Sequence, residues 1–209
     1  MNKSYFRLFL KLLNMSEFWL YFKLGLYHVL DWQAYDHILF LIVLVVGYTF
    51  NDWKRVLWLV TLFTLGHTLS LILSVYNVVS VNSGLVEFLI PITIFVTALF
   101  NVFTAGKGAR REKLGLLYFS AIFFGIIHGL GFSYYFNHIV SGNNSGKLLP
   151  LAEFALGIEA AQIIVVLIVL ILGFIFQSIF RFSKRDWMLV ISSIVIGIII
   201  PMLISNYPW

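Results

Sequence analysis

Four ionisable side chains in this 209-residue chain lie where a membrane helix would normally carry apolar groups. Asp36 and His37 begin the apolar run "AYDHILFLIVLVVG", His67 lies within "FTLGHTLSL", and His128 lies within "GIIHGLGF". Three imidazoles and a carboxylate are a common way to bind zinc or nickel without sulfur. Because the chain has no cysteine, a metal site here must use histidine, carboxylate, amide or hydroxyl groups.

Three further polar residues in apolar segments are candidates for contacts behind the ligands or for an ion path, namely Glu87, Glu159 and Gln162. Glu159 and Gln162 are spaced i,i+3 and therefore share one face of a helix. Glu87 lies close to the start of its apolar run, so it can instead cap that helix or reach the headgroup region. A lone histidine in an apolar helix is often a hydrogen-bonded core residue, but three at one depth favour a metal or proton site.

The same residues also fit a hydrolase. Three histidines and an aspartate around one zinc ion can activate a water molecule for attack on a lipid or peptide carbonyl. In that case Asp36, Ser70 and Glu159 are the candidate catalytic residues. Ser and Thr in membrane helices more often bond to their own backbone carbonyls, which is the structural alternative for Ser70. The many phenylalanines indicate packing or lipid contact, and we expect no organic cofactor.

The elements that must position these residues are membrane helices. The chain is 61% hydrophobic and 11% charged, with a mean hydropathy of +0.96, whereas soluble domains carry about 25% charged residues. The composition predicts an all-α polytopic bundle in a lipid bilayer. The net charge of +5 belongs to short connections that set topology, so we expect no nucleic-acid partner.

Windows of roughly 20 apolar residues divide most of the chain into predicted spans. Six spans are expected, over residues 35–51, 55–78, 84–104, 114–138, 151–180 and 187–206. Residues 1–30 form an N-terminal extension with a short amphipathic helix, which is either interfacial or half-inserted or else a seventh span. Residues 31–209 then make up the transmembrane bundle.

Lysine and arginine alternate cleanly between the predicted connections. "NDWKR", "GKGARREK" and "RFSKR" are basic, whereas "YNVVSVNSG" has no lysine or arginine and "SGNNSGK" has one. The basic connections are expected on the cytoplasmic side, with the C-terminus outside, in a bacterial inner membrane. At about 1.5 Å per residue, His67 and His128 then lie about 18 Å and about 22 Å from the cytoplasmic ends of their helices. The site is expected in the outer half of the bilayer, with Asp36 and His37 at its rim.

Five blocks of the chain, taken in order, resemble the HupE/UreJ family of membrane proteins, and most closely its second branch. They are "GLYHVLDWQAYDHILFLIVL", "FTLGHTLSL", "LVEFLIPITI", "GIIHGLGF" and "GIEAAQIIVV", which together cover about residues 20–170. The resemblance implies a bundle of about six or seven helices that handles nickel or cobalt. The metal-handling residues that it implies are His28, Asp36, His37, His67, Glu87, His128 and Glu159. Here the block from His28 to His37 is longer than in the nickel-permease branch and has Ala34 in place of a glycine.

Two functions lead on the sequence, ahead of a structural or assembly role. The first is a permease that draws a divalent ion such as nickel or cobalt into a His/carboxylate site. The second is a membrane-embedded zinc-dependent hydrolase whose site opens to the non-cytoplasmic side. The sequence offers no comparable set of polar groups for an onward ion path in the cytoplasmic half, and this argues against the permease.

Overall fold

The protein is all-helical in its described part. The structure, a computed structural model, describes residues 3–32, 34–106, 114–140 and 146–208, and these contain no strand. The helices are α1 (Lys3–Leu30), α2 (Asp36–Val45), α3 (Trp53–Val75), α4 (Ser83–Thr104), α5 (Leu114–Val140), α6 (Leu148–Ser178) and α7 (Lys184–Ser205), with a 3-10 turn, η1 (Phe50–Asp52), before α3. The all-helical prediction is confirmed for the described residues, and each predicted span overlaps one of these helices.

Within the described residues, four helical segments are long and apolar enough to cross a bilayer, namely 50–75, 83–104, 148–178 and 184–205. The first predicted span, 35–51, differs from its prediction because α2 ends at Val45 after 10 residues. Ten residues rise about 15 Å, which is half of a hydrocarbon core of about 30 Å. The chain beyond α2 turns through residues 46–49 into η1, whose capping box joins Thr49 and Asp52.

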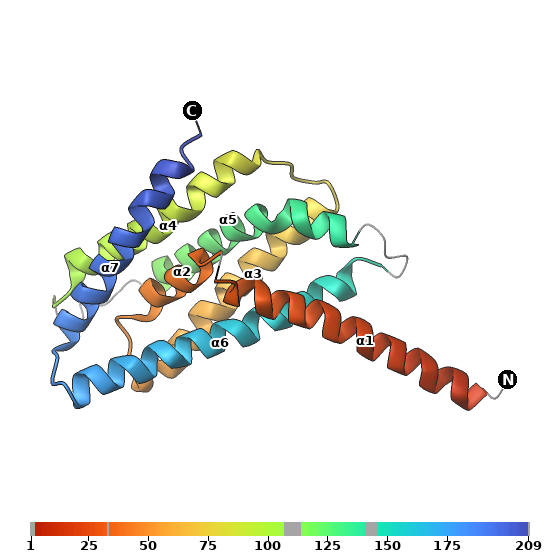
Figure 1. The fold of residues 1–209 in the computed structure, drawn as a ribbon, viewed down its shortest axis with the longest axis horizontal. Coiled ribbons are helices and arrows are strands. Elements are labelled where there is room, and N and C mark those ends of the chain that lie inside the picture. The colour runs from red at the N-terminus through yellow and green to blue at the C-terminus, as the bar shows by residue number, and fades with distance from the viewer. Residues whose placement is uncertain (1–2, 33, 107–113, 141–145, 209) are drawn as a thin grey trace.

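The helices pack as three main pairs around the short α2. The pairs are α3 with α5, α1 with α6, and α4 with α7, and α2 contacts α4 and α6 as well as the end of α1. In Figure 1, α2 lies in the middle of the molecule, and the N-terminal part of α1 extends away from the other helices. This arrangement brings the beginning of α2 and the end of α1 into the interior of the bundle.

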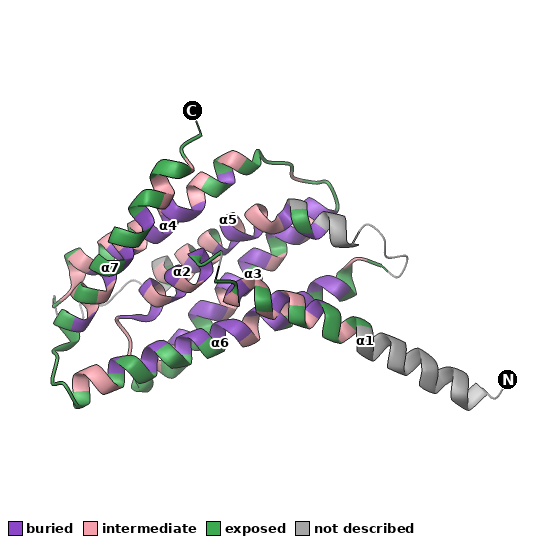
Figure 2. Cartoon of the chain, viewed as in Figure 1, coloured by how far each residue is buried: buried purple, intermediate pink, exposed green. Residues whose placement is uncertain are grey.

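The outward faces of the bundle are apolar. Large hydrophobic side chains are exposed along α6 and α7, including Leu167, Ile171, Phe174, Ile194 and Ile198. Figure 2 shows exposed and buried residues alternating along both helices. An exposed apolar surface of this extent is typical of contact with lipid. The structure therefore agrees with an integral membrane protein.

The connections gather at two opposite ends of the bundle. The α2–α3 and α6–α7 connections lie at one end, whereas the α3–α4 connection and the start of α6 lie at the other (Figure 1). We call the first the basic end, because Lys54, Arg55, Lys184 and Arg185 are located there. At this end the Ser183 side chain accepts a hydrogen bond from the backbone N–H of Asp186 and so caps the start of α7.

Candidate metal centre

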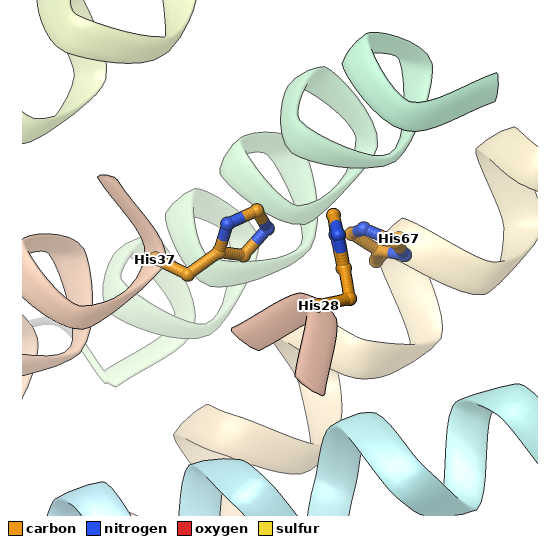
Figure 3. Close-up of side chains that lie close together, drawn as sticks. All are labelled: His28, His37 and His67. Atoms are coloured by element: carbon orange, nitrogen blue, oxygen red, sulfur yellow. The ribbon is translucent and has the colours of Figure 1, made fainter. Parts of the chain in front are cut away.

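Four histidines from four different helices meet inside the bundle. His28 lies in the last turn of α1, His37 in the first turn of α2, His67 in α3 and His128 in α5. Figure 3 shows the rings of His28, His37 and His67 gathered in one space between the helices. His37, His67 and His128 are buried and His28 is half-buried. We call these four residues the histidine cluster.

The rings are close enough to share an ion. The ring centroid of His37 lies 4.5 Å from that of His28, 6.0 Å from that of His67 and 5.1 Å from that of His128. Among the residues that the structure describes, two groups have one ligand atom per residue within 4.8 Å of one another, namely His28–His37–His67 and Asp36–His37–His128. His37 belongs to both groups and is therefore the centre of the cluster.

Hydrogen bonds to a carboxylate and to a hydroxyl oxygen fix the orientation of two of the rings. The Nδ1–H of His37 donates to Oδ1 of Asp36 at 3.2 Å, because an ionised carboxylate only accepts. The Thr93 hydroxyl donates to the Ile90 carbonyl at 2.7 Å and lies 3.2 Å from Nε2 of His128. Since a hydroxyl has one proton, Thr93 must accept from His128. In the neutral rings, Nε2 of His37 and Nδ1 of His128 then carry free lone pairs.

Several ring nitrogens of the cluster have no hydrogen-bond partner although they are buried. They are Nε2 of His28, Nε2 of His37, both nitrogens of His67 and Nδ1 of His128. An unpaired buried polar atom costs free energy, and each one in a native structure calls for an explanation. Imidazole lone pairs are ligands for zinc, nickel and cobalt. The donor set of the cluster therefore fits a divalent transition-metal ion.

Aromatic rings surround the histidines. The ring of His28 lies 3.9 Å from that of Phe132, which stacks on Phe154 with a centroid distance of 5.2 Å and an interplanar angle of 2°. The His128 ring lies 5.1 Å from that of Phe40 and 5.2 Å from that of Phe63. These phenylalanines lower the local dielectric and restrict the rotamers of the imidazoles, as expected of packing groups.

Two glycines bring the backbones of α3 and α5 into contact. A Cβ atom added at Gly66 would collide with the carbonyl oxygen of Ile122, and one added at Gly125 would collide with that of Phe63. Each glycine therefore packs against the carbonyl of the residue three positions before the other glycine. Small residues at such crossings let membrane helices approach closely.

A third glycine continues this contact at the histidines themselves. A Cβ atom at Gly129 would collide with the carbonyl oxygen of His67 and with the hydroxyl of Ser70. Because Gly66 precedes His67 and Gly129 follows His128, the close approach of the two backbones occurs at the two histidines. The glycine–histidine spacing thus positions both imidazoles at the same depth in the bundle.

The α1–α6 pair uses the same kind of crossing. A Cβ atom at Gly25 would collide with the carbonyl oxygen of Phe154, and one at Gly157 would collide with that of Phe22. This contact holds the last turn of α1, and with it His28, against α6. The second half of α1 is therefore part of the bundle.

Asp36 and His37 lie deeper than predicted, whereas Glu87 and Ser70 do not belong to the ligand groups. Asp36 and His37 were expected at the rim of the site, but they are 8% and 4% exposed, because α2 begins inside the bundle. Glu87 is exposed on α4 and belongs to neither group of ligands. The Ser70 hydroxyl donates to the carbonyl oxygen of His67 at 2.8 Å, which is a bond within its own helix.

Glu159 and Gln162 face α3 rather than the histidines. Glu159 Oε1 accepts from the Thr61 hydroxyl at 2.6 Å, and Gln162 Oε1 accepts from the Thr64 hydroxyl at 2.8 Å. The sequence reasoning missed these threonines. The only signal for them is their spacing, since Thr61 and Thr64 precede His67 by six and three residues.

Thr93 is the other functional residue that the sequence reasoning missed. It lies two residues after Pro91 in an apolar helix and is 4% exposed. A threonine at that place usually bonds to its own helix, and Thr93 does so while also contacting His128. No pattern in the sequence separates these two roles.

Comparison with known proteins gives one result. Residues 7–206 match the family model described as HupE / UreJ protein, which extends the resemblance beyond residues 20–170 at both ends. No curated protein and no solved structure is detectably similar to the chain. Because the match covers nearly all of its 209 residues, the chain belongs to the HupE/UreJ family.

Proposed function

We propose that the protein is a membrane permease for a divalent transition-metal ion of the nickel and cobalt class. The family is associated with nickel and cobalt transport. The observation that carries the proposal is the set of buried, unpartnered nitrogens in the histidine cluster. Under this proposal the transported ion takes the place of the missing hydrogen-bond partners, and it binds to neutral imidazoles and the Asp36 carboxylate.

Within the cluster we assign His37, His67, His128 and His28 as ligands. Asp36 orients His37 and can itself bind the ion, since it belongs to the Asp36–His37–His128 group. Because His37 is common to both groups, an ion can pass from one group to the other without losing its contact with His37. A cargo ion needs such overlapping positions, since it must leave the site that attracted it.

The break between α1 and α2 also supports transport. The C-terminal end of a helix carries unpaired carbonyls and partial negative charge, which favour a cation. His28 lies at that end of α1, and Asp36 and His37 lie at the start of α2. The basic end is then cytoplasmic under the positive-inside rule.

The zinc-dependent hydrolase is the less well supported alternative. A hydrolase needs a coordination position that substrate and water can reach. His67 and His128 are 0% and 1% exposed, and the Ser70 hydroxyl already donates to a backbone carbonyl. The Thr61–Glu159 and Thr64–Gln162 pairs also place polar groups on the basic-end side of the cluster. The lack of such groups was the main argument against a permease.

The proposal is tested with purified full-length protein. Ni²⁺ and Co²⁺ binding is measured in detergent by calorimetry, and uptake into proteoliposomes is measured by plasma mass spectrometry. We expect binding and uptake in the wild type and loss of both in His67→Ala and His128→Ala. Glu87→Gln is the matched control, because Glu87 is exposed and outside the cluster, and it should behave as the wild type. Binding of neither ion, or wild-type binding in both histidine variants, would contradict the proposal.

A further inference from the structure

Two polar pairs lie between α3 and α6, close to the middle of both helices and on the basic-end side of His67 along α3. They are Thr61 with Glu159 and Thr64 with Gln162, with oxygen–oxygen distances of 2.6 and 2.8 Å. Both helices are otherwise strongly apolar. Because α3 and α6 run in opposite directions, each pair joins the member nearer the basic end on one helix to the member farther from it on the other, so the two pairs lie side by side at about the same depth. We call these four residues the polar ladder.

The ladder continues the histidine cluster along α3. His67, Thr64 and Thr61 follow at intervals of three residues, so they share one side of the helix. The two threonines lie about 4.5 Å and about 9 Å from His67 along the axis. This direction leads to the start of α3, where Lys54 and Arg55 mark the basic end.

The partners on α6 lie in the same direction. Phe154 packs near His67, with ring centroids 6.3 Å apart. Glu159 and Gln162 follow Phe154 by five and eight residues, and α6 runs from there toward the basic end (Figure 1). Both helices therefore place the ladder between the histidine cluster and the basic end.

One member of the ladder lacks a partner. Gln162 is 0% exposed, and its Nε2 makes no hydrogen bond. The Thr64 hydroxyl can donate to the amide oxygen or accept from the amide nitrogen, so it can hold the amide in either orientation. In the second orientation the amide oxygen is free to face a cation. A buried amide with one unsatisfied hydrogen-bonding atom in an apolar helix costs free energy unless a ligand binds to it.

The chemistry of the ladder suits an ion that is leaving the histidines. Hydroxyl, amide and carboxylate oxygens bind nickel and cobalt more weakly than imidazole nitrogens, in keeping with the softness of these ions. Conduction requires several sites that are weak enough to release the ion. Glu159 also adds a negative charge, which favours a cation in a low-dielectric region.

We propose that Thr61, Thr64, Glu159 and Gln162 form the exit segment through which a divalent cation passes from the histidine cluster to the basic end. This inference rests on the proposed permease function and names the path of the same cargo. It predicts that the ladder controls the rate of passage and that the histidines control binding.

The experiment separates these two quantities with Co²⁺ as the probe. Full-length wild type, Glu159→Gln, Gln162→Leu and Thr64→Val are compared, after size-exclusion chromatography shows that each is monodisperse. We expect Co²⁺ affinity in detergent to stay within about threefold of wild type, and uptake into proteoliposomes to fall at least about tenfold, which corresponds to about 1.4 kcal/mol. Thr64→Ser, which keeps the hydroxyl, should retain the uptake of the wild type.

Gln177→Leu is the matched control on α6. The Gln177 amide donates to the carbonyl of Gly173 in its own helix and does not belong to the ladder, so uptake should equal that of wild type. Wild-type uptake in Glu159→Gln and Gln162→Leu would overturn the exit segment, as would loss of Co²⁺ binding in the isosteric Thr64→Val. Absence of both binding and uptake in the wild type would instead refute the permease itself.

Discussion

The region around the histidines and the α4–α7 pair are built from helices of similar length and polarity, yet they are held together differently. At the cluster, Gly66 and Gly125 place the backbones of α3 and α5 in direct contact. In the α4–α7 pair, a Cβ atom at Gly197 would meet nothing within 4 Å. Side chains such as Val195 and Ile199 form that contact instead.

This difference shows where the fold requires fixed geometry. Backbone contact leaves no flexible side chain to adjust at the crossing, so the separation of α3 and α5 can change little there. Ligand atoms for a metal must be held within about 0.5 Å, and rigid elements hold them best. The α4–α7 pair carries no ligand, and contact through side chains is sufficient there.

The largest effect is expected at the centre of the cluster. His37→Gln removes the residue that both ligand groups share, so affinity for Ni²⁺ or Co²⁺ should fall by more than about a hundredfold, beyond the range expected for a residue behind a ligand. Calorimetry of the purified protein measures this change. Glu87→Gln on α4 is the control and should leave affinity unchanged. Equal affinity in the His37 variant and the wild type would remove His37 from the site.

The next largest effect is expected at the α3–α5 crossing. Gly66→Ala or Gly125→Ala forces the two backbones apart, and overpacking of this kind costs about 1–3 kcal/mol of stability. The melting temperature in detergent should fall, and metal affinity should drop about tenfold or more, in the range that loss of a supporting contact produces. If both variants bind and melt as the wild type does, the backbone contact does not position the ligands.

A smaller effect is expected at Thr93, which belongs to α4 but contacts the cluster. Thr93→Val keeps the shape and removes the acceptor for Nε2–H of His128, so affinity should fall about tenfold. Thr97→Val one turn away removes only a bond to the helix's own backbone and should have no effect on binding. Similar affinities in the two variants would show that Thr93 does not orient His128.

The smallest effect is expected in the α4–α7 pair. Gly197→Ala adds a methyl group in open space and improves helix propensity, so stability should change by no more than about 1 kcal/mol, in the favourable direction. Metal affinity should not change. A fall in melting temperature comparable with that of Gly66→Ala would contradict the contrast between the two regions.

The sequence predicted the helices and much of the cluster, for identifiable reasons. Ionisable groups in apolar runs are visible without a structure, so Asp36, His37, His67 and His128 could be singled out as candidates from the sequence. His28 was implied only by the family resemblance, because it lies in a segment whose place in the membrane the sequence leaves open. The structure places it 4.5 Å from His37, ring to ring.

Two features could not be read from the sequence. The apolar run after His37 continues to residue 51, and hydrophobicity alone does not indicate that the helix ends at Val45. Thr61 and Thr64 resemble ordinary helix threonines until α6 is placed beside them. Which helix faces which is a property of the packed bundle, and interhelical pairs therefore have no local signal.

The central claim is that imidazoles from several helices bind one ion, and X-ray absorption spectroscopy of the Co²⁺-loaded full-length protein tests it most directly. We expect a first shell of nitrogen and oxygen around Co²⁺, with the outer-shell scattering that is characteristic of at least two imidazole rings. In His37→Gln that imidazole scattering should fall or disappear. A wild-type spectrum of oxygen ligands alone, without imidazole scattering, would contradict the account.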